Sequence, residues 1–179
     1  MKKLSLLALC LSFGLSLSAQ KLKTRSGYVK FFSDAPVEDI TAENKQVSSI
    51  INLENGEFAF LVPINAFQFE KALMQEHFNE NYMESGQYPK AIFKGKIEGY
   101  DKINLEKDGS YTLTFKGTMT IHGVEQDLAQ EVKLSVKDGK LSATAEFMLK
   151  CSDYKIEIPT AKADNISNEI AITVKFDYA

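Results

Sequence analysis

The sequence has few of the features that divide a chain into separately folded parts. It contains four prolines in 179 residues, and no glycine- and serine-rich linker, low-complexity segment or internal repeat interrupts it. The length therefore predicts one domain with its own hydrophobic core. Lysine and arginine are nowhere clustered, and the net charge is −3. Because a phosphate backbone is bound by a basic surface, nucleic acid is not an expected partner.

Residues for catalysis and metal binding are equally scarce. His77 and His122 are the only histidines, neither has another histidine four residues away, and no cysteine or carboxylate cluster has the spacing of zinc ligands. The sequence also lacks a Gly-x-Ser-x-Gly elbow, a phosphate-binding glycine loop and a dinucleotide fingerprint. His122 ends a Thr-Ile-His-Gly strand and is expected to bond backbone or water, and His77 is expected on a solvated helical face with Glu76 and Glu80. We therefore expect no enzyme, no cofactor and no metal site.

The first 19 residues have the layout of an export signal. Lys2 and Lys3 precede an apolar run over residues 4–17, and the small residues Ser18 and Ala19 follow it. The run is about as long as the apolar part of a signal peptide and short for a membrane span. We expect cleavage after Ala19, with cleavage after Ser18 as the alternative and a retained membrane anchor as the competing interpretation.

Cleavage would leave residues 20–179 as the mature domain, in the periplasm or outside the cell and without a stable membrane anchor. It would remove two lysines and no acidic residue, which changes the net charge from −3 to −5. Cys10 would be lost as well, so Cys151 would have no partner for an internal disulfide. For Cys151 we favour a partly buried, inert thiol over a reactive one.

Most of the mature chain alternates apolar and polar residues with a period of two, which is typical of β-strands with one buried face. The clearest segments are Ser110–Ile121, Asp127–Val136 and Lys140–Lys150, and the Asp138-Gly139 pair favours a tight hairpin between the last two. About eight strands predict an antiparallel barrel or sandwich, and closure into a barrel would protect the edges. The acidic stretch Asp34–Glu43 is expected to be a solvated loop. The other predicted strands are Tyr28–Asp34, Gln46–Leu53, Phe58–Ile64, Ala91–Gly99 and Ile170–Tyr178.

One segment, Phe67–Tyr88, lacks this alternation and has apolar residues at helical spacing. Met74, Phe78 and Tyr82 are four residues apart, which predicts a helix of three to four turns that ends before Ser85-Gly86. An inserted helix of this kind commonly lies across one open end of a barrel. Its apolar residues would line an entrance there or, alternatively, plug the barrel. These residues are Phe67, Phe69, Met74, Phe78 and Met83.

Three segments resemble a known family. Tyr88–Gly95 is similar to the tyrosine-proline, strand and phenylalanine element of YceI-like proteins, and Gly117–Val124 to their most distinctive stretch. Ser152-Asp153-Tyr154, followed by Pro159, resembles their serine-aspartate-aromatic segment. The resemblance covers essentially the whole mature chain and is strong from about Glu76 onward. It implies a lipocalin-like, eight-stranded antiparallel barrel whose elongated interior binds polyisoprenoid chains, as in exported bacterial proteins of that family.

The N-terminal part departs from the family pattern. The aspartate, histidine and serine that occur together near the family's first strand are not evident as a set in Lys23–Tyr28, and the region before the helix is shortened. The length of the pocket, and so of the ligand chain, is therefore left open.

The predicted function is that of an exported protein that sequesters or carries a polyisoprenoid-like or other long apolar ligand. A narrow apolar interior would stabilise such a chain by about 25 cal/mol per Å² of buried apolar surface. Each lining residue could instead be ordinary core packing. The alternative function is an exported interaction or stress-related barrel protein with a filled core and no small ligand. Besides the helix residues, the expected lining residues are Phe60, Phe93, Phe115, Met119, Phe147 and Phe176.

Overall fold

The alternating segments form eight long strands in a computed structural model that describes residues 21–178. The predicted signal peptide and its cleavage site lie outside these residues. A ninth strand, β4 (Gln68–Phe69), is two residues long and pairs with the start of β2. The eight long strands are β1 (Lys21–Ser33), β2 (Ile40–Asn52), β3 (Glu57–Pro63), β5 (Lys90–Glu98), β6 (Gly109–Ile121), β7 (Val124–Lys137), β8 (Lys140–Lys150) and β9 (Glu169–Asp177).

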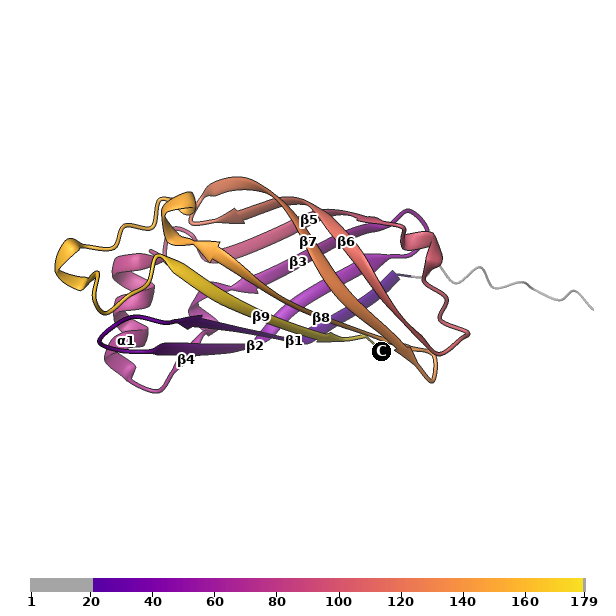
Figure 1. The fold of residues 1–179 in the computed structure, drawn as a ribbon, viewed down its shortest axis with the longest axis horizontal. Helices are drawn as coiled ribbons and strands as arrows, with labels where there is room; N and C mark the ends of the chain where they lie inside the picture. The colour runs from indigo at the N-terminus through magenta and orange to yellow at the C-terminus, as the bar shows by residue number, and fades with distance from the viewer. Residues whose placement is uncertain (1–20, 179) are drawn as a thin grey trace, which may run out of the picture.

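The strands close into an antiparallel barrel, which confirms the predicted all-β class. Their order is β1-β9-β8-β7-β6-β5-β3-β2, and β2 pairs again with β1. Figure 1 shows the barrel lengthwise, with α1 (Ala72–His77) and the segment after β8 at one end. We call this the helical end. The turn at Asp138-Gly139 and the end of β9 lie at the opposite end, which we call the turn end.

Two hairpins of the barrel have two-residue turns that require a left-handed backbone. Asp138 and Gly139 have φ of 51° and 75°, and His122 and Gly123 have φ of 51° and 71°. Positive φ at both central residues is the pattern of a type I′ turn, whose twist matches that of the strands it joins. The predicted hairpin between β7 and β8 is confirmed, with Lys137 opposite Lys140.

The first two strands are longer than the sequence predicts. The acidic stretch is a loop only over residues 34–39, because β2 begins at Ile40 and carries the fully buried Ala42 and Asn44. The prediction of a loop as far as Glu43 is therefore wrong. In β1, two shifts of register between Thr24 and Val29 break the alternation, which hides the start of this strand in the sequence.

The predicted helix is present over residues 72–82, as α1 followed by a π-helical stretch, Phe78–Tyr82. This is about three turns. It ends before Ser85-Gly86, as predicted, and the residue with a left-handed backbone just after it is Glu84, with φ of 43°. The Glu84 carbonyl accepts hydrogen bonds from the backbone N–H groups of Gln87 and Tyr88, which fix this conformation. Short 3₁₀ turns occur at Ile64–Ala66, Tyr100–Lys102, Cys151–Tyr154 and Thr160–Lys162.

The turn end of the barrel is filled by its own side chains. Phe115, Ile51, Leu134 and Leu141 are among the largest fully buried residues. Tyr178 is also buried there, and its hydroxyl lies 2.6 Å from Ser49 Oγ, so the phenol keeps a hydrogen bond inside the apolar core. The closed end therefore provides stability, and any space for a ligand lies in the other half.

A pair of glycines allows β5 and β6 to approach each other very closely in mid-barrel. Gly95 and Gly117 are directly opposite. A Cβ atom on either would lie 2.1 Å from a carbonyl oxygen of the facing strand, that of Lys116 or Lys94 respectively. Only glycine fits such an approach, which is a common device where a barrel bends sharply.

Candidate functional site: an apolar cavity at the helical end

The half of the barrel next to the helical end encloses a cavity of about 340 Å³. Its wall includes residues of every long strand, for example Val29 of β1, Val62 of β3 and Ile172 of β9. The volume lies at the lower end of the range usual for small-molecule sites. Most of the surrounding side chains are aliphatic or aromatic, so the cavity suits an apolar ligand.

Glu38, Lys150 and Lys162 border the cavity, and the first two form ion pairs with residues outside its lining. Glu38 accepts a hydrogen bond of 2.6 Å from Lys71 Nζ, and Lys150 Nζ lies 3.4 Å from Glu169. The buried Ser33 hydroxyl accepts a hydrogen bond of 2.9 Å from the backbone N–H of Ser167. Because Glu38, Lys150 and Ser33 already have partners, a ligand in the cavity does not need to form hydrogen bonds with them.

Aromatic rings form the floor of the cavity. Phe60 and Phe176 stack with their ring centroids 4.9 Å apart, and both rings border the cavity. On the far side, Phe58 contacts Phe115 with a centroid distance of 4.9 Å. Phe115 is fully buried in this packed layer and is not among the lining residues. Phe115, which the sequence predicts as a ligand-binding residue, thus lies in the packed layer next to Phe60, with a centroid distance of 6.0 Å.

A second aromatic cluster covers the cavity at the helical end. Phe31 of β1 lies 5.4 Å from Phe67, 5.6 Å from Phe69 and 5.4 Å from Phe78, measured between ring centroids. The backbone N–H of Phe69 donates to Gln75 Oε1 at 3.2 Å, which ties the helix to the short strand before it. The helical segment is therefore held across the barrel end by ring contacts, as the sequence predicts for its position.

Ten of the eleven residues expected to bind the ligand border this cavity. Sequence reasoning missed Phe31, although it follows Val29 on the inward face of β1, and it missed Ile156 and Ile166, which come from an irregular segment without a periodic signal. The ten bordering residues are Phe60, Phe67, Phe69, Met74, Phe78, Met83, Phe93, Met119, Phe147 and Phe176.

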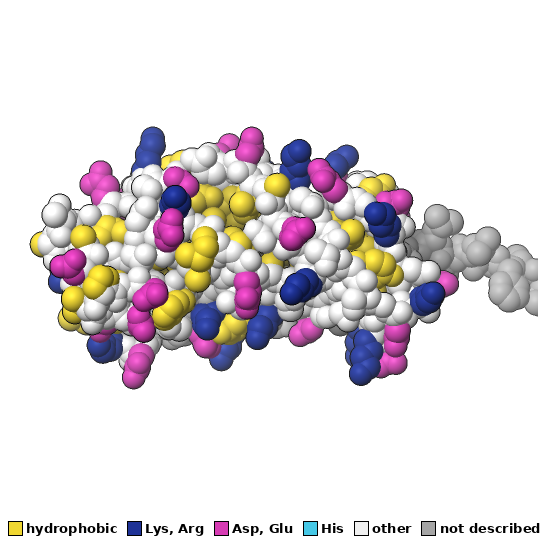
Figure 2. Space-filling view, viewed as in Figure 1, with side chains coloured by type: hydrophobic (Ala, Val, Ile, Leu, Met, Phe, Trp, Pro, Cys, Tyr) yellow, Lys and Arg dark blue, Asp and Glu magenta, His cyan; other side chains and the backbone are white. Residues whose placement is uncertain are grey.

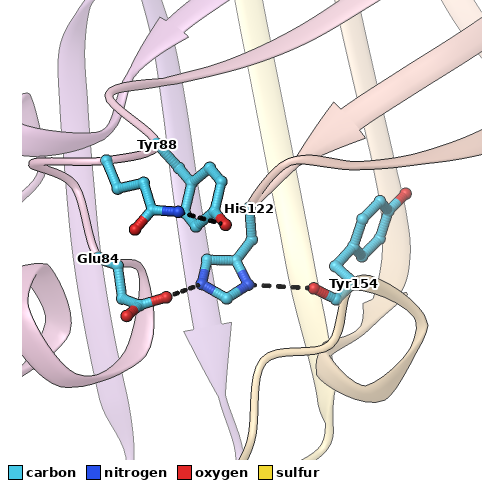
Figure 3. Close-up of polar contacts among 5 residues, drawn as sticks. Glu84, Tyr88, His122 and Tyr154 are labelled. Atoms are coloured by element: carbon cyan, nitrogen blue, oxygen red, sulfur yellow. Dashed lines mark hydrogen bonds and ion pairs between the residues drawn. The ribbon is translucent and has the colours of Figure 1, made fainter.

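His122 lies outside the cavity and joins three segments at the helical end (Figure 3). Its Nε2 lies 2.9 Å from Glu84 Oε2, and its Nδ1 lies 3.3 Å from the Tyr154 carbonyl oxygen. The Tyr88 ring packs edge-on against the imidazole with a centroid distance of 4.6 Å. These contacts tie the end of the helix and the segment after β8 to the turn between β6 and β7.

Cys151 borders the cavity with a half-buried side chain and is the free cysteine of the described residues. Burial raises the pKa of the thiol to about 11. A thiol in this state is mostly protonated near neutral pH and is a poor nucleophile. Among residues 21–178, no group of three or more His, Cys, Asp or Glu side chains is arranged to hold a metal ion.

The sequence matches the YceI-like domain family over residues 21–178. The chain belongs to the YceI-like family. No curated protein matches its sequence. Within the described part of this YceI-like chain, no helix is long and apolar enough to cross a membrane.

Solved structures share the fold of this YceI-like protein at low sequence identity. A polyisoprenoid binding domain from Saccharophagus degradans, implicated in plant cell wall breakdown, has a TM-score of 0.74 and 15% identity, covering 88% of this chain and 97% of that chain. Burkholderia cenocepacia BcnA has a TM-score of 0.69 and 15% identity, covering 86% and 96%. A Campylobacter jejuni YceI protein has a TM-score of 0.62 and 18% identity, covering 80% and 86%. At such identities the likeness concerns the fold.

The three segments that carry the family resemblance in the sequence meet around His122. Tyr88 comes from the first segment, His122 from the second and Tyr154 from the third. The YceI-like segments therefore help to hold the helical end together. They also contribute to the cavity wall, through Phe93, Met119 and Tyr154.

Proposed function

We propose that this YceI-like barrel binds a long apolar molecule of the polyisoprenoid kind in the cavity at its helical end. The observation that carries the proposal is the cavity itself, with its aromatic floor and its cover of Phe31, Phe67, Phe69 and Phe78. The similarity in fold to a domain described as polyisoprenoid binding supports this ligand class.

The physical driving force is the removal of apolar surface from water. Burial contributes roughly 0.8 kcal/mol per methylene group, offset in part by the freedom that the ligand loses on binding. A chain without strong polar groups suits a wall in which Glu38 and Lys150 already have partners. Binding of this kind needs no catalytic group, and we propose a role in sequestering or carrying the ligand.

We also propose that the protein acts after export, in the periplasm or outside the cell. The support for this location is the signal-like layout of residues 1–19. A carrier there would keep a water-insoluble chain dispersed between membranes or away from them.

An interaction protein with a filled core is the weaker alternative. It requires an interior occupied by the protein's own side chains, which describes only the turn end, around Phe115 and Leu134. The hollow half has no evident purpose in such a protein.

The direct test is native mass spectrometry of the protein purified from the exported fraction of its own cells, followed by solvent extraction and identification of what is released. A long-chain lipid or quinone in a one-to-one ratio is the expected result. A mass without ligand, unchanged after incubation with an isoprenoid alcohol such as geranylgeraniol, would overturn the proposal.

A further inference from the structure

The wall between β7 and β8 is only partly closed. β7 has fourteen residues and β8 has eleven, yet they pair only from Lys133 opposite Thr144 to Lys137 opposite Lys140, next to their hairpin turn. Beyond this point each strand still pairs fully with its other neighbour, β6 or β9. The two strands therefore diverge towards the helical end. We call the opening between Val124–Val132 of β7 and Ala145–Lys150 of β8 the slot.

Burial changes along the inward faces of the two strands at the same point. In the paired part, Leu134 and Leu141 are 1% exposed. In the unpaired part, Phe147 and Leu149 have the same inward phase but are only half-buried. The cavity also reaches Thr144, an exposed residue of the opposite phase, and Gln130 on the facing strand. The lining of the cavity thus reaches both strands that border the slot.

The slot faces the viewer in Figures 1 and 2. In Figure 1, β7 rises away from β8 towards the helical end, and strands of the far wall are drawn between them. Figure 2 has the same direction of view and shows hydrophobic side chains at the surface over this region, flanked by charged ones. Met148, on the outward face of β8, is 55% exposed beside the slot.

Both ends of the slot are fixed. At the turn end it is limited by the pair Lys133 and Thr144. At the helical end, Gln126 Nε2 of β7 donates a hydrogen bond of 2.8 Å to the carbonyl oxygen of Asp153, just after β8, and Tyr154 is buried next to it. The strands are therefore rejoined beyond the slot. Because the two strands are connected on both sides of the slot, the slot is a bounded opening and not a pair of frayed strand ends.

Aromatic rings stand across part of the axial route into the cavity. At the helical end, Phe78 stacks on Phe31 and packs edge-on against Phe67, with centroid distances of 5.4 and 5.6 Å. A ligand that enters along the barrel axis would have to separate these rings. A ligand that enters through the slot would meet side chains but no paired backbone.

We propose that the slot is the lateral entrance through which a long apolar chain passes into and out of the cavity. The inference rests on the proposed function, and it adds the route. A sideways entrance admits a chain in an extended form without threading it end first, which suits a ligand longer than the cavity.

The test closes the slot with a reversible cross-link. In a Cys151→Ser background, whose own binding is the reference, Glu131→Cys and Glu146→Cys add thiols on exposed positions just beyond the last pair. Ser135→Cys and Ser142→Cys, which are opposite each other in the paired part of the same strands, are the matched control. Both variants are joined with a bifunctional methanethiosulfonate and released with dithiothreitol. The probe is the anthranilate ester of geranylgeraniol, followed by stopped-flow fluorescence.

Cross-linking across the slot is expected to slow association and release by at least tenfold, with the equilibrium Kd changed less than threefold and the rates restored by dithiothreitol. The control pair is expected to keep its rates. Equal rates with and without the slot cross-link would overturn the lateral entrance but not lipid binding. If the reference itself does not bind the probe, the proposed function fails, and this inference fails with it.

A second variant covers the case in which the slot cross-link distorts the barrel. Gln130→Trp narrows the slot from within β7, whereas Glu131→Trp adds the same ring on the exposed outer face of the neighbouring position. Slower probe uptake in Gln130→Trp alone supports the entrance. Identical uptake rates in both would overturn it.

Discussion

Phe60 and Phe176 stack 4.9 Å apart at the boundary between a packed half of the barrel and a hollow half. Below these rings the side chains fill the interior, and above them they surround the cavity. Substitutions on the two sides should therefore have different effects, on stability below the rings and on ligand retention above them.

The contrast is sharpest between Met119 and Phe115, which lie on the same face of β6. Met119→Gln places an amide in the apolar cavity, where an unpaired amide costs about 1–3 kcal/mol. We expect at least a fivefold loss of the lipid that copurifies, with an unchanged circular dichroism spectrum. Phe115→Leu removes packing below the floor, and we expect a loss of about 1–2 kcal/mol in the free energy of unfolding with lipid retention unchanged.

Urea unfolding and lipid extraction on the same preparations separate the two effects. Should both variants lose lipid in proportion to stability, the floor would not divide the barrel functionally, and Met119 would be ordinary core.

The same two residues show what the sequence can and cannot predict. Alternation along β6 correctly assigns Phe115 and Met119 to the interior, because the period depends on the strand alone. Their separation by a floor depends on Phe60 and Phe176, which come from distant strands. The eight strands, the hairpin at Asp138-Gly139 and the helix across one end follow from local patterns.

Features that arise between strands could not be predicted in this way. In β7, Gln126 and Gln130 interrupt the apolar phase within the slot, but nothing in the sequence indicates that pairing with β8 stops at Lys133. The start of β1 is hidden for a different reason. Its register shifts interrupt the alternation of apolar and polar residues, although the strand stays paired with β2 on both sides of them. The left-handed Glu84 depends on contacts with the turn after β6 as well as on its own neighbours.

The contacts of His122 should hold the helical end in place. His122→Asn keeps a residue that tolerates the left-handed turn position, φ of 51°, but has too short a side chain to reach both partners. We expect the free energy of unfolding to fall by about 1–3 kcal/mol, from the loss of two hydrogen bonds worth roughly 0.5–1.5 kcal/mol each. Amide hydrogen exchange should become faster at residues 84–90 and 151–156 and stay unchanged in the Asp138-Gly139 hairpin.

Glu84→Gln is the matched control, because its amide can still form a hydrogen bond with the ring. Exchange that accelerates uniformly over the barrel in His122→Asn would mean that the histidine supports the fold as a whole and not the helical end.

Tyr178 should make the protein sensitive to alkaline pH. Burial raises the pKa of its phenol well above the usual 10, although the hydrogen bond with Ser49 opposes this. Above pH 10 the unfolded chain releases the tyrosine proton while the folded chain keeps it. The contribution of Tyr178 to the free energy of unfolding is therefore fully present below pH 10. It decreases as the pH rises further, by up to about 1.4 kcal/mol per pH unit.

Urea unfolding between pH 8 and 11.5 measures this slope, and Tyr178→Phe is the comparison. At pH 8 the free energy of unfolding of the variant is expected to be lower by about 1 kcal/mol, because the hydrogen bond is lost. Above pH 10 its free energy of unfolding should fall less steeply than that of the original protein. A decline of equal slope in both proteins would assign the alkaline sensitivity to other groups, such as the buried Tyr154.

Cys151 offers a report on cavity occupancy, since its thiol borders the cavity and burial raises its pKa to about 11. At pH 8 such a thiol is almost entirely protonated, so its alkylation by iodoacetamide should be slower than that of an exposed thiol by about tenfold or more. Met148→Cys in a Cys151→Ser background supplies an exposed thiol near the end of β8 for comparison.

A bound lipid should slow alkylation of Cys151 further and leave that of the introduced thiol unchanged, because the bound chain would exclude the reagent from the cavity. If delipidation with organic solvent does not accelerate the reaction at Cys151, as followed by intact-mass spectrometry after refolding, the ligand does not occupy the part of the cavity next to this thiol.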